Sequence, residues 1–282
     1  MSGLAWGRRY LMCPPEHFRV AYEINPWMHT EVTVDPDAAM AEWMGLVATL
    51  RAAGADIEIQ PAVEGVPDLV FTANAGIVSG SQFVPSRFRH AERQPETEHD
   101  IDWFEAHGFR IDLLSEDVDQ EGAGDALPFG AGAGAGGRGP VLVAGYRFRS
   151  DAAAHAQLSK MLNVPVRSVE LVDERFYHLD ITFCPLDDRR AIVWPGAWDR
   201  FGCRVMEALV PEALVLEADE ANCFVANSVV VGTTVVLPSC PPRVGRQLEA
   251  WGFDPVECGI NEFLKAGGGC RCLTLALDVD LS

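Results

Sequence analysis

The feature that most constrains the fold is a repeated order of a helix, a glycine and a short strand. Apolar residues recur at helical spacing in five segments, 38–53, 98–107, 151–162, 200–209 and 242–251. Three of these segments run up to Gly54, Gly108 and Gly252, and glycine is the residue that a left-handed helix C-cap favours. A strand-like run follows each glycine, at 56–59, 109–114 and 253–258. The chain therefore repeats one helix-to-strand unit.

Each unit continues through a loop into a second strand-like segment that opens with polar residues. There are five such segments, 67–78, 124–129, 177–184, 222–231 and 269–277. Marker residues in them lie roughly 45 to 57 residues apart, a period found in repeat and propeller folds. The markers are Asp68, Asp125, Asp180, Asn227 and Cys272. The pattern predicts an α/β fold and fits a ring of ββαβ units and one mixed sheet equally well.

Size and charge limit the domain organisation and the partners. The chain has 282 residues, 48% of them hydrophobic, which predicts one domain over residues 1–282. Forty-one acidic residues against 22 basic ones give a formal net charge of −19. This charge repels nucleic-acid phosphates and anionic membranes, so neither is expected as a partner. A small cationic substrate fits better, although an acidic surface that only keeps the protein soluble explains the charge equally well.

The cysteines and the N-terminus indicate a cytoplasmic protein. Residues 1–14 contain no apolar signal region, and no later stretch is long and apolar enough to span a membrane. The eight cysteines are scattered, which favours reduced thiols over a disulfide scaffold. Cys270 and Cys272 form a Cys-x-Cys pair without a second pair or nearby histidine, so no metal site is expected. The glycine-alanine stretch 130–140 lacks the lysine of a phosphate-binding loop and is interpreted as a flexible hairpin tip.

Polar residues inside apolar, strand-forming segments are the candidate site, because burying them without partners is costly. These are Asn74, Glu121, Asp125, His178, Asp180, Asn227 and Cys272. In a strand, His178 and Asp180 share one face, which suits an acid–base pair, but an isolated His-x-Asp is more often a buried histidine satisfied by a neighbouring carboxylate.

Cys272 follows three glycines, and Arg271 precedes it directly. Exposed backbone amides and positive charge in such a turn can lower the pKa of a thiol. In a strand Cys270 would face the same side, so local periodicity does not choose between the two cysteines.

Six ordered motifs resemble those of the guanidino-group-modifying superfamily, which includes arginine deiminases, dimethylarginine dimethylaminohydrolases and amidinotransferases. The motifs are 23–27, 67–76, 87–93, 121–125, 177–180 and 267–274. Together they cover nearly the whole chain in the family's order. The resemblance implies the five-unit ββαβ pseudo-symmetric α/β propeller called a pentein, and a cysteine-dependent enzyme that needs no metal or organic cofactor.

The same resemblance implies a role for each matched residue. Cys272 is the nucleophile, His178 the general acid and base, and Glu121 a catalytic carboxylate that binds guanidinium nitrogens. Substrate contacts are implied for Asp180, which supplies a second carboxylate, for Arg93, which clamps the α-carboxylate, and for Asn25.

Two departures from the family pattern bear on the chemistry. An extra residue separates Glu121 from Gly124 and Asp125, so Asp125 can share the role given to Glu121. Asn74 stands where deiminases and dimethylarginine hydrolases carry an aspartate. The Asn74 form is similar to the arginine dihydrolase group, which takes arginine to ornithine, ammonia and carbon dioxide.

The sequence leaves three other functions open. Hydrolysis of dimethylarginine to citrulline ranks second and amidino transfer ranks third. A non-catalytic arginine-binding protein on the same scaffold is the alternative of a different class. A homo-oligomer also remains open.

Overall fold

The computed structural model describes residues 6–130 and 140–281, so most of the glycine-alanine stretch lies outside the described residues. In these ranges the chain forms five three-stranded sheets. Each sheet pairs two strands antiparallel and adds a third strand parallel to the second, and a helix precedes that third strand. This arrangement confirms the predicted five-unit ββαβ propeller.

The elements of each unit follow one order, strand, strand, helix, strand. The first unit is β15 (Leu275–Ala276), β1 (Arg9–Met12), α1 (Pro36–Ala52) and β2 (Asp56–Ile59). The second is β3 (Gly76–Ser79), β4 (Gln82–Pro85), α2 (Glu96–Ala106) and β5 (Arg110–Ile111). The third is β6 (Ala126–Phe129), β7 (Val141–Tyr146), α3 (Ala154–Met161) and β8 (Val166–Glu170). The fourth is β9 (Phe183–Pro185), β10 (Arg190–Val193), α4 (Arg200–Leu209) and β11 (Glu212–Val215). The fifth is β12 (Val229–Val231), β13 (Thr234–Leu237), α6 (Pro242–Ala250) and β14 (Asp254–Glu257).

Short helices and 3-10 turns connect the units. They are α5 (Ala218–Asn222), α7 (Asn261–Leu264), η1 (Pro67–Val70), η2 (Thr72–Asn74), η3 (Gly122–Gly124), η4 (Glu174–Phe176) and η5 (Leu179–Ile181). A further turn, η6 (Pro195–Ala197), lies between β10 and α4 of the fourth unit. None of these was expected from helical periodicity, because one or two turns are too short to show it.

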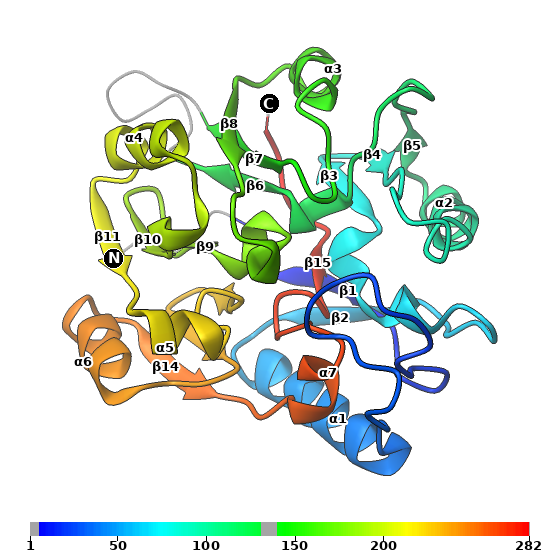
Figure 1. The fold of residues 1–282 in the computed structure, drawn as a ribbon, viewed down its shortest axis with the longest axis horizontal. Helices are drawn as coiled ribbons and strands as arrows, with labels where there is room; N and C mark the ends of the chain where they lie inside the picture. The colour runs from blue at the N-terminus through cyan, green and yellow to red at the C-terminus, as the bar shows by residue number, and fades with distance from the viewer. Residues whose placement is uncertain (1–5, 131–139, 282) are drawn as a thin grey trace.

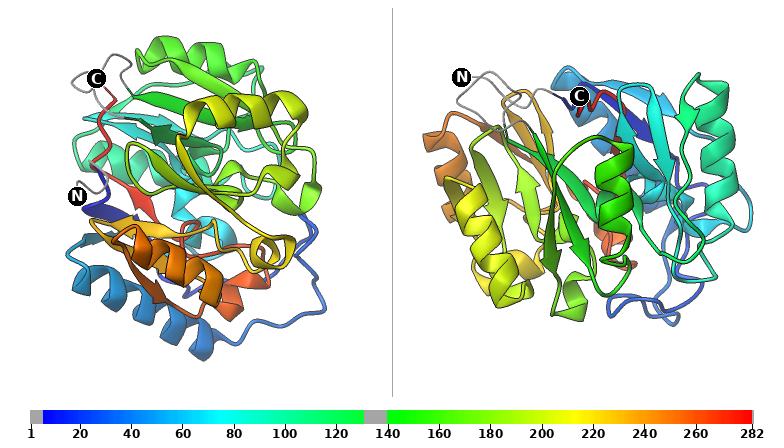
Figure 2. Two further views of the ribbon diagram at one scale, coloured as in Figure 1. Left: turned by 90° about the vertical axis from the view of Figure 1, so that its left-hand side faces the viewer. Right: turned by 90° about the horizontal axis from the view of Figure 1, so that it is seen from above.

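The five sheets surround a common centre, and the helices of the units lie on the outside (Figure 1). The ring closes because β1, near the N-terminus, lies between β2 and the C-terminal strand β15. Both chain ends lie on one face of the molecule, whereas the segment between β1 and α1 runs over the opposite face (Figure 2). Apolar side chains of the outer helices, such as Leu46, Leu158 and Leu248, are fully buried against the sheets.

The glycine caps predicted from the sequence are present. Gly54, Gly108 and Gly252 have φ of 97°, 82° and 81°, the left-handed conformation that glycine adopts without a Cβ clash. At the other end of α1, the Asp35 carboxylate accepts hydrogen bonds from the amides of Asp37 and Ala38, and Pro36 occupies the first turn.

The segments that open with polar residues differ from the expectation, because their polar residues lie in tight turns and only their later residues form strands. Three successive units share one turn, in which a hydroxyl donates to the carbonyl oxygen three residues earlier. The donors are Thr182, Ser228 and Thr274, at 2.9, 2.7 and 3.0 Å. Such local bonds compete with strand pairing. The turns carry the polar residues to the centre of the ring.

Within the described residues, no helix is long and apolar enough to cross a membrane.

Candidate active site

A pocket lies at the centre of the ring, on the side covered by the segment between β1 and α1. Five of the eight predicted site residues line it, namely Asn25, Asn74, Arg93, His178 and Cys272. Glu121, Asp125 and Asp180 are not among its lining residues. The five residues come from five different connecting segments of the chain.

Cys272 lies in the turn before β15 and is held by two neighbouring units. Its Sγ is 3.2 Å from Asn227 Nδ2 and 3.6 Å from Asp180 Oδ2. Burial raises the pKa of the Cys272 thiol, and the charge of Asp180 raises it further. Both effects favour the neutral thiol over the thiolate.

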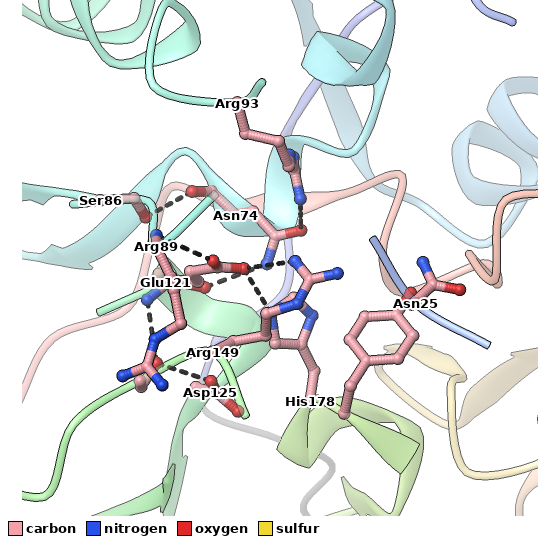
Figure 3. A network of polar contacts seen from close by, with 12 residues as sticks. Asn25, Asn74, Ser86, Arg89, Arg93, Glu121, Asp125, Arg149 and His178 are labelled. Carbon is pink, nitrogen blue, oxygen red and sulfur yellow. Dashed lines mark hydrogen bonds and ion pairs between the residues drawn. The ribbon is translucent and has the colours of Figure 1, made fainter. Parts of the chain in front are cut away.

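His178 and Arg149 both contact the Glu121 carboxylate (Figure 3). Its Nε2 is 2.9 Å from Glu121 Oε2, and the same oxygen accepts from Arg149 Nη1 at 2.9 Å. Burial disfavours the Glu121 carboxylate, but the Arg149 charge and the His178 hydrogen bond outweigh it, so the pKa of Glu121 lies below its usual value. Glu121 is thus an ionised partner of the histidine, placed behind it rather than in the pocket.

Asp125 links two parts of the fold. Its Oδ1 accepts from the amide of Leu179 at 3.0 Å and its Oδ2 from Ser150 Oγ at 2.6 Å. Burial raises its pKa to about 6. These contacts hold the turn that follows His178, and Asp125 itself is buried and does not line the pocket.

Asp180 directs one carboxylate oxygen to Cys272 Sγ, while its Oδ1 has no hydrogen-bond partner among the described residues. Burial raises its pKa to about 7, against the opposing effect of the Arg271 charge. An unpaired buried carboxylate oxygen next to a thiol is a ready acceptor for an N–H donor.

Arg93 is fixed by a buried network. Its Nε and Nη2 bind the two oxygens of Glu96 at 2.7 Å each, and its Nη1 donates to Asn74 Oδ1 at 2.9 Å. Asn74 Nδ2 in turn donates to the carbonyl oxygen of Glu121 at 3.0 Å. Asn74 therefore bridges Arg93 and the chain before η3, as Figure 3 shows.

The pocket is also lined by three polar residues that were not predicted as site residues. They are Asp68, Arg149 and Tyr177. Arg149 Nη2 donates a hydrogen bond to the carbonyl oxygen of Ile24 at 2.9 Å. Its Cζ lies over the Tyr177 ring, 4.7 Å from the ring centroid. In the sequence, Asp68 marks one of the five repeated segments and is not a predicted site residue. Arg149 follows β7 with no local pattern that separates it from a surface arginine.

Carboxylates outnumber guanidinium groups around the pocket. Asp68, Glu96, Glu121 and Asp180 are buried there, and the buried arginines are Arg93, Arg149 and Arg271. Burial raises the pKa of Asp68, whose nearest cation is Arg93 at 3.8 Å. Burial raises the pKa of Asp180 as well, so a positive charge in the pocket would favour the ionised forms of these two carboxyl groups.

A cluster that could hold a metal ion lies at the surface. Glu23, His29 and Glu31 have ligand atoms within 4.8 Å of one another and are all exposed. Glu23 Oε1 already accepts two hydrogen bonds from Thr30. This cluster has the features of a loop contact rather than those of a built metal site.

Three of the curated proteins similar to this chain are named for enzymes of arginine or dimethylarginine. A bifunctional arginine dihydrolase/ornithine cyclodeaminase of Nostoc sp. is 43% identical over 271 residues, which cover 95% of this chain and 37% of that protein. The N(G),N(G)-dimethylarginine dimethylaminohydrolase of Mycobacterium tuberculosis is 39% identical over 270 residues, covering 96% of this chain and 86% of that protein. The chain thus spans just over a third of the bifunctional relative and most of the second. No protein-family model matches the chain.

Solved structures agree with these relatives. The N-terminal domain of an arginine dihydrolase from the ornithine-ammonia cycle in cyanobacteria, a cysteine-to-serine variant bound to substrate, matches with a TM-score of 0.91 at 39% identity. The match covers 97% of this chain and 99% of that one. A dimethylarginine dimethylaminohydrolase of Pseudomonas aeruginosa with citrulline matches with a TM-score of 0.78 at 17% identity, which bears on the fold alone.

Proposed function

The chain belongs to the guanidino-group-modifying superfamily, and we propose that it is a cysteine-dependent hydrolase that takes L-arginine to ornithine, ammonia and carbon dioxide. One observation carries the proposal: the Cys272 thiol and the His178 imidazole line the same buried pocket, with Asp180 against the sulfur. A nucleophile, a proton carrier and a carboxylate are the groups that attack on a guanidinium carbon requires.

The charge of the pocket favours a cationic substrate. A guanidinium group donates N–H bonds in a fixed plane. Two acceptors are available to it, the carboxylate of Asp68, which lines the pocket, and the unpaired oxygen of Asp180, which lies next to Cys272. Burial raises the pKa of Asp68, of Asp180 and of the Cys272 thiol in the free protein. The positive charge of a bound guanidinium would lower all three pKa values. Binding and activation of the nucleophile would therefore occur together.

The proposed first hydrolysis proceeds through a covalent intermediate. The Cys272 thiolate forms a C–S bond to the guanidinium carbon, and His178 gives a proton to the departing amine, which leaves as ammonia. A water that loses a proton to His178 then adds to the amidino-thioether carbon. The C–S bond breaks, and the thiolate and the ureido product are released. Glu121, ionised behind His178, would stabilise the imidazolium form at both proton transfers.

The second hydrolysis acts on the ureido group by the same route. Attack by Cys272 expels the amine of ornithine, which takes a proton from His178, and water releases carbamate from the sulfur. Carbamate decomposes to ammonia and carbon dioxide. Asn74, a neutral lining residue where an aspartate would add a negative charge, suits a pocket that must hold a neutral ureido group as well.

The α-carboxylate of the substrate is proposed to meet arginine side chains at the pocket mouth. Arg93 already makes four hydrogen bonds within the described residues, whereas Arg149 makes two. A guanidinium has five N–H donors, so Arg149 retains more of them for a carboxylate. Arg149 is therefore added to Arg93 and Asn25 as a proposed substrate contact.

Dimethylarginine hydrolysis to citrulline is the second candidate, favoured by the 39% identity to the mycobacterial enzyme. Amidino transfer is the third. We further propose that residues 1–282 act as one catalytic unit, since β15 completes the sheet of β1 and β2. A reducing cytoplasm suits the eight cysteines, all of which are free thiols.

Product chromatography separates the candidates. The purified protein is incubated separately with arginine, with asymmetric dimethylarginine and with agmatine, and Cys272→Ser serves as the control. Ornithine and about two equivalents of ammonia from arginine support the proposal. Citrulline from methylated arginine alone replaces it with the second candidate, and no product from any of the three substrates contradicts both.

A further inference from the structure

The Asn227 side chain is fully buried between the nucleophile loop and the turn of the neighbouring unit. Its Oδ1 accepts from the backbone amides of Arg271 and Cys272, at 3.0 and 3.2 Å. Two N–H donors on one amide atom identify that atom as the oxygen. The nitrogen must then face the other way, where it lies 3.2 Å from both Cys272 Sγ and the carbonyl oxygen of Asp180.

The backbone around Asn227 is shaped for this contact. Asn227 closes a turn in which its amide donates to the carbonyl oxygen of Phe224 at 2.9 Å, and Phe224 has a φ of 57°. A bulky residue in the left-handed region is strained, and such strain is retained where the surrounding structure requires it. Across the contact, a Cβ on Gly269 would lie 2.4 Å from Asn227 Oδ1, so only glycine lets the nucleophile loop approach.

We propose that Asn227 is a positioning residue for the reaction, which fixes the Cys272 loop through Oδ1 and stabilises the Cys272 thiolate through Nδ2. The inference depends on the proposed function only in taking Cys272 as the nucleophile. A buried thiolate beside a carboxylate has few groups to stabilise it. The backbone amide of Gly269 and the Asn227 amide are the two that lower the pKa of this thiol, against burial and Asp180, which raise it.

The two functions of the amide can be separated by substitution. Asn227→Asp keeps an oxygen for the two backbone amides but replaces the donor facing Sγ with an acceptor. Asn227→Ser is neutral and shorter, and it removes the donor without burying a charge. Asn163→Asp, at an exposed position after α3, is the matched control.

Alkylation of the thiol by iodoacetamide tests the proposal without any arginine turnover. The thiolate displaces iodide and forms a C–S bond, so the rate follows the thiolate fraction. The Cys272 peptide is quantified by mass spectrometry across a pH series, with the half-buried Cys203 of α4 as an internal reference. We expect the midpoint for Cys272 to rise by about one pH unit or more in both Asn227 variants, roughly a tenfold loss of thiolate at fixed lower pH. The Cys203 profile and the Asn163→Asp control should not change.

A folded Asn227→Ser or Asn227→Asp protein with the parent's alkylation midpoint would overturn the proposal. If neither variant folds, Asn227 is needed for the structure alone, and this outcome also counts against the proposal. Steady-state kinetics then locate the effect: loss of kcat with little change in KM is expected, because the thiolate and not the substrate loses its partner. A raised midpoint in a protein that fails to hydrolyse arginine would support Asn227 while refuting the proposed function.

Discussion

Cys270 and Cys272 lie two residues apart in the same loop, yet their sulfur atoms occupy different surroundings. Cys272 lines the pocket and contacts Asn227 and Asp180. Cys270 is fully buried, with Sγ 3.8 Å from the carbonyl oxygen of Cys258, whose thiol it also hydrogen bonds. The loop is a turn and not a strand, so residues at a spacing of two do not share a face here.

This difference predicts opposite results for two matched substitutions. Cys272→Ser should abolish turnover, because the serine hydroxyl has no comparable anion at neutral pH. Cys270→Ser should retain most of the activity, since its sulfur does not line the pocket. Initial rates of ammonia release, with circular dichroism to verify folding, provide the comparison. Equal losses in two folded variants would contradict the assignment of the nucleophile.

His178→Ala should bind substrate and release product slowly. Without the imidazole, His178 no longer donates a proton to the departing amine, and turnover should fall by roughly two to four orders of magnitude. Binding of arginine, measured by calorimetry in the Cys272→Ser background, should weaken far less. Near-normal turnover at neutral pH would exclude His178 as the proton carrier.

Stability should depend on pH through Asp100 in α2, which is almost fully buried and accepts from Gln60 Nε2 at 2.8 Å. Burial raises its pKa from 3.8 to about 7. Between these two pH values the folded protein retains a proton that the unfolded chain has lost, so the free energy of unfolding falls as pH rises from about 4 to about 7. Asp100→Asn removes this titration and should be more stable than the parent at pH 8, by about 4 kcal/mol.

Urea unfolding at pH 5 and pH 8 measures the effect, and Asp102→Asn, exposed on the same helix, is the control. If Asp100→Asn has the same pH dependence as the parent protein, burial of Asp100 does not contribute to it.

Much of the fold could be predicted because its signals are local. Helical periodicity and the glycine caps at 54, 108 and 252 depend on neighbouring residues alone, and the strand at 56–59 was predicted at its exact bounds. The number of units and their closure into a ring were not local. The resemblance to a family supplied them, because pairing of β1 with β15 joins residues from opposite ends of the chain.

The site could be predicted as a set of residues but not as an arrangement. Glu121 and Asp125 were expected at the substrate, and the structure places them behind His178 and its turn. Arg149 was missed because its importance arises from contacts with Glu121 and Ile24, which are far away in sequence. A buried ion pair across such a distance leaves no trace in local periodicity.

Substrate selection should depend on the α-carboxylate. Agmatine, which lacks this group, should be a poor substrate, and Arg149→Lys should reduce the preference for arginine over agmatine by roughly 10- to 100-fold. The ratio of the two kcat/KM values is the relevant measurement, because a general loss of activity cancels in it. Arg93→Lys should reduce the ratio less, since Arg93 already makes four hydrogen bonds and Arg149 makes two. Efficient use of agmatine by the parent protein would remove both arginines from this role.

Asn74→Asp tests the basis of the dihydrolase proposal. An aspartate would add a negative charge at the pocket and would lose the hydrogen bond from Nδ2 to the carbonyl oxygen of Glu121. The added charge favours the cationic guanidinium over the neutral ureido group, so the second hydrolysis should slow more than the first. Products of arginine should therefore shift from ornithine toward citrulline, which chromatography resolves. Asn163→Asp, exposed and away from the pocket, should leave the ratio unchanged. A variant that still yields only ornithine would show that Asn74 does not select the second step, and a parent protein that yields only citrulline would exclude double hydrolysis.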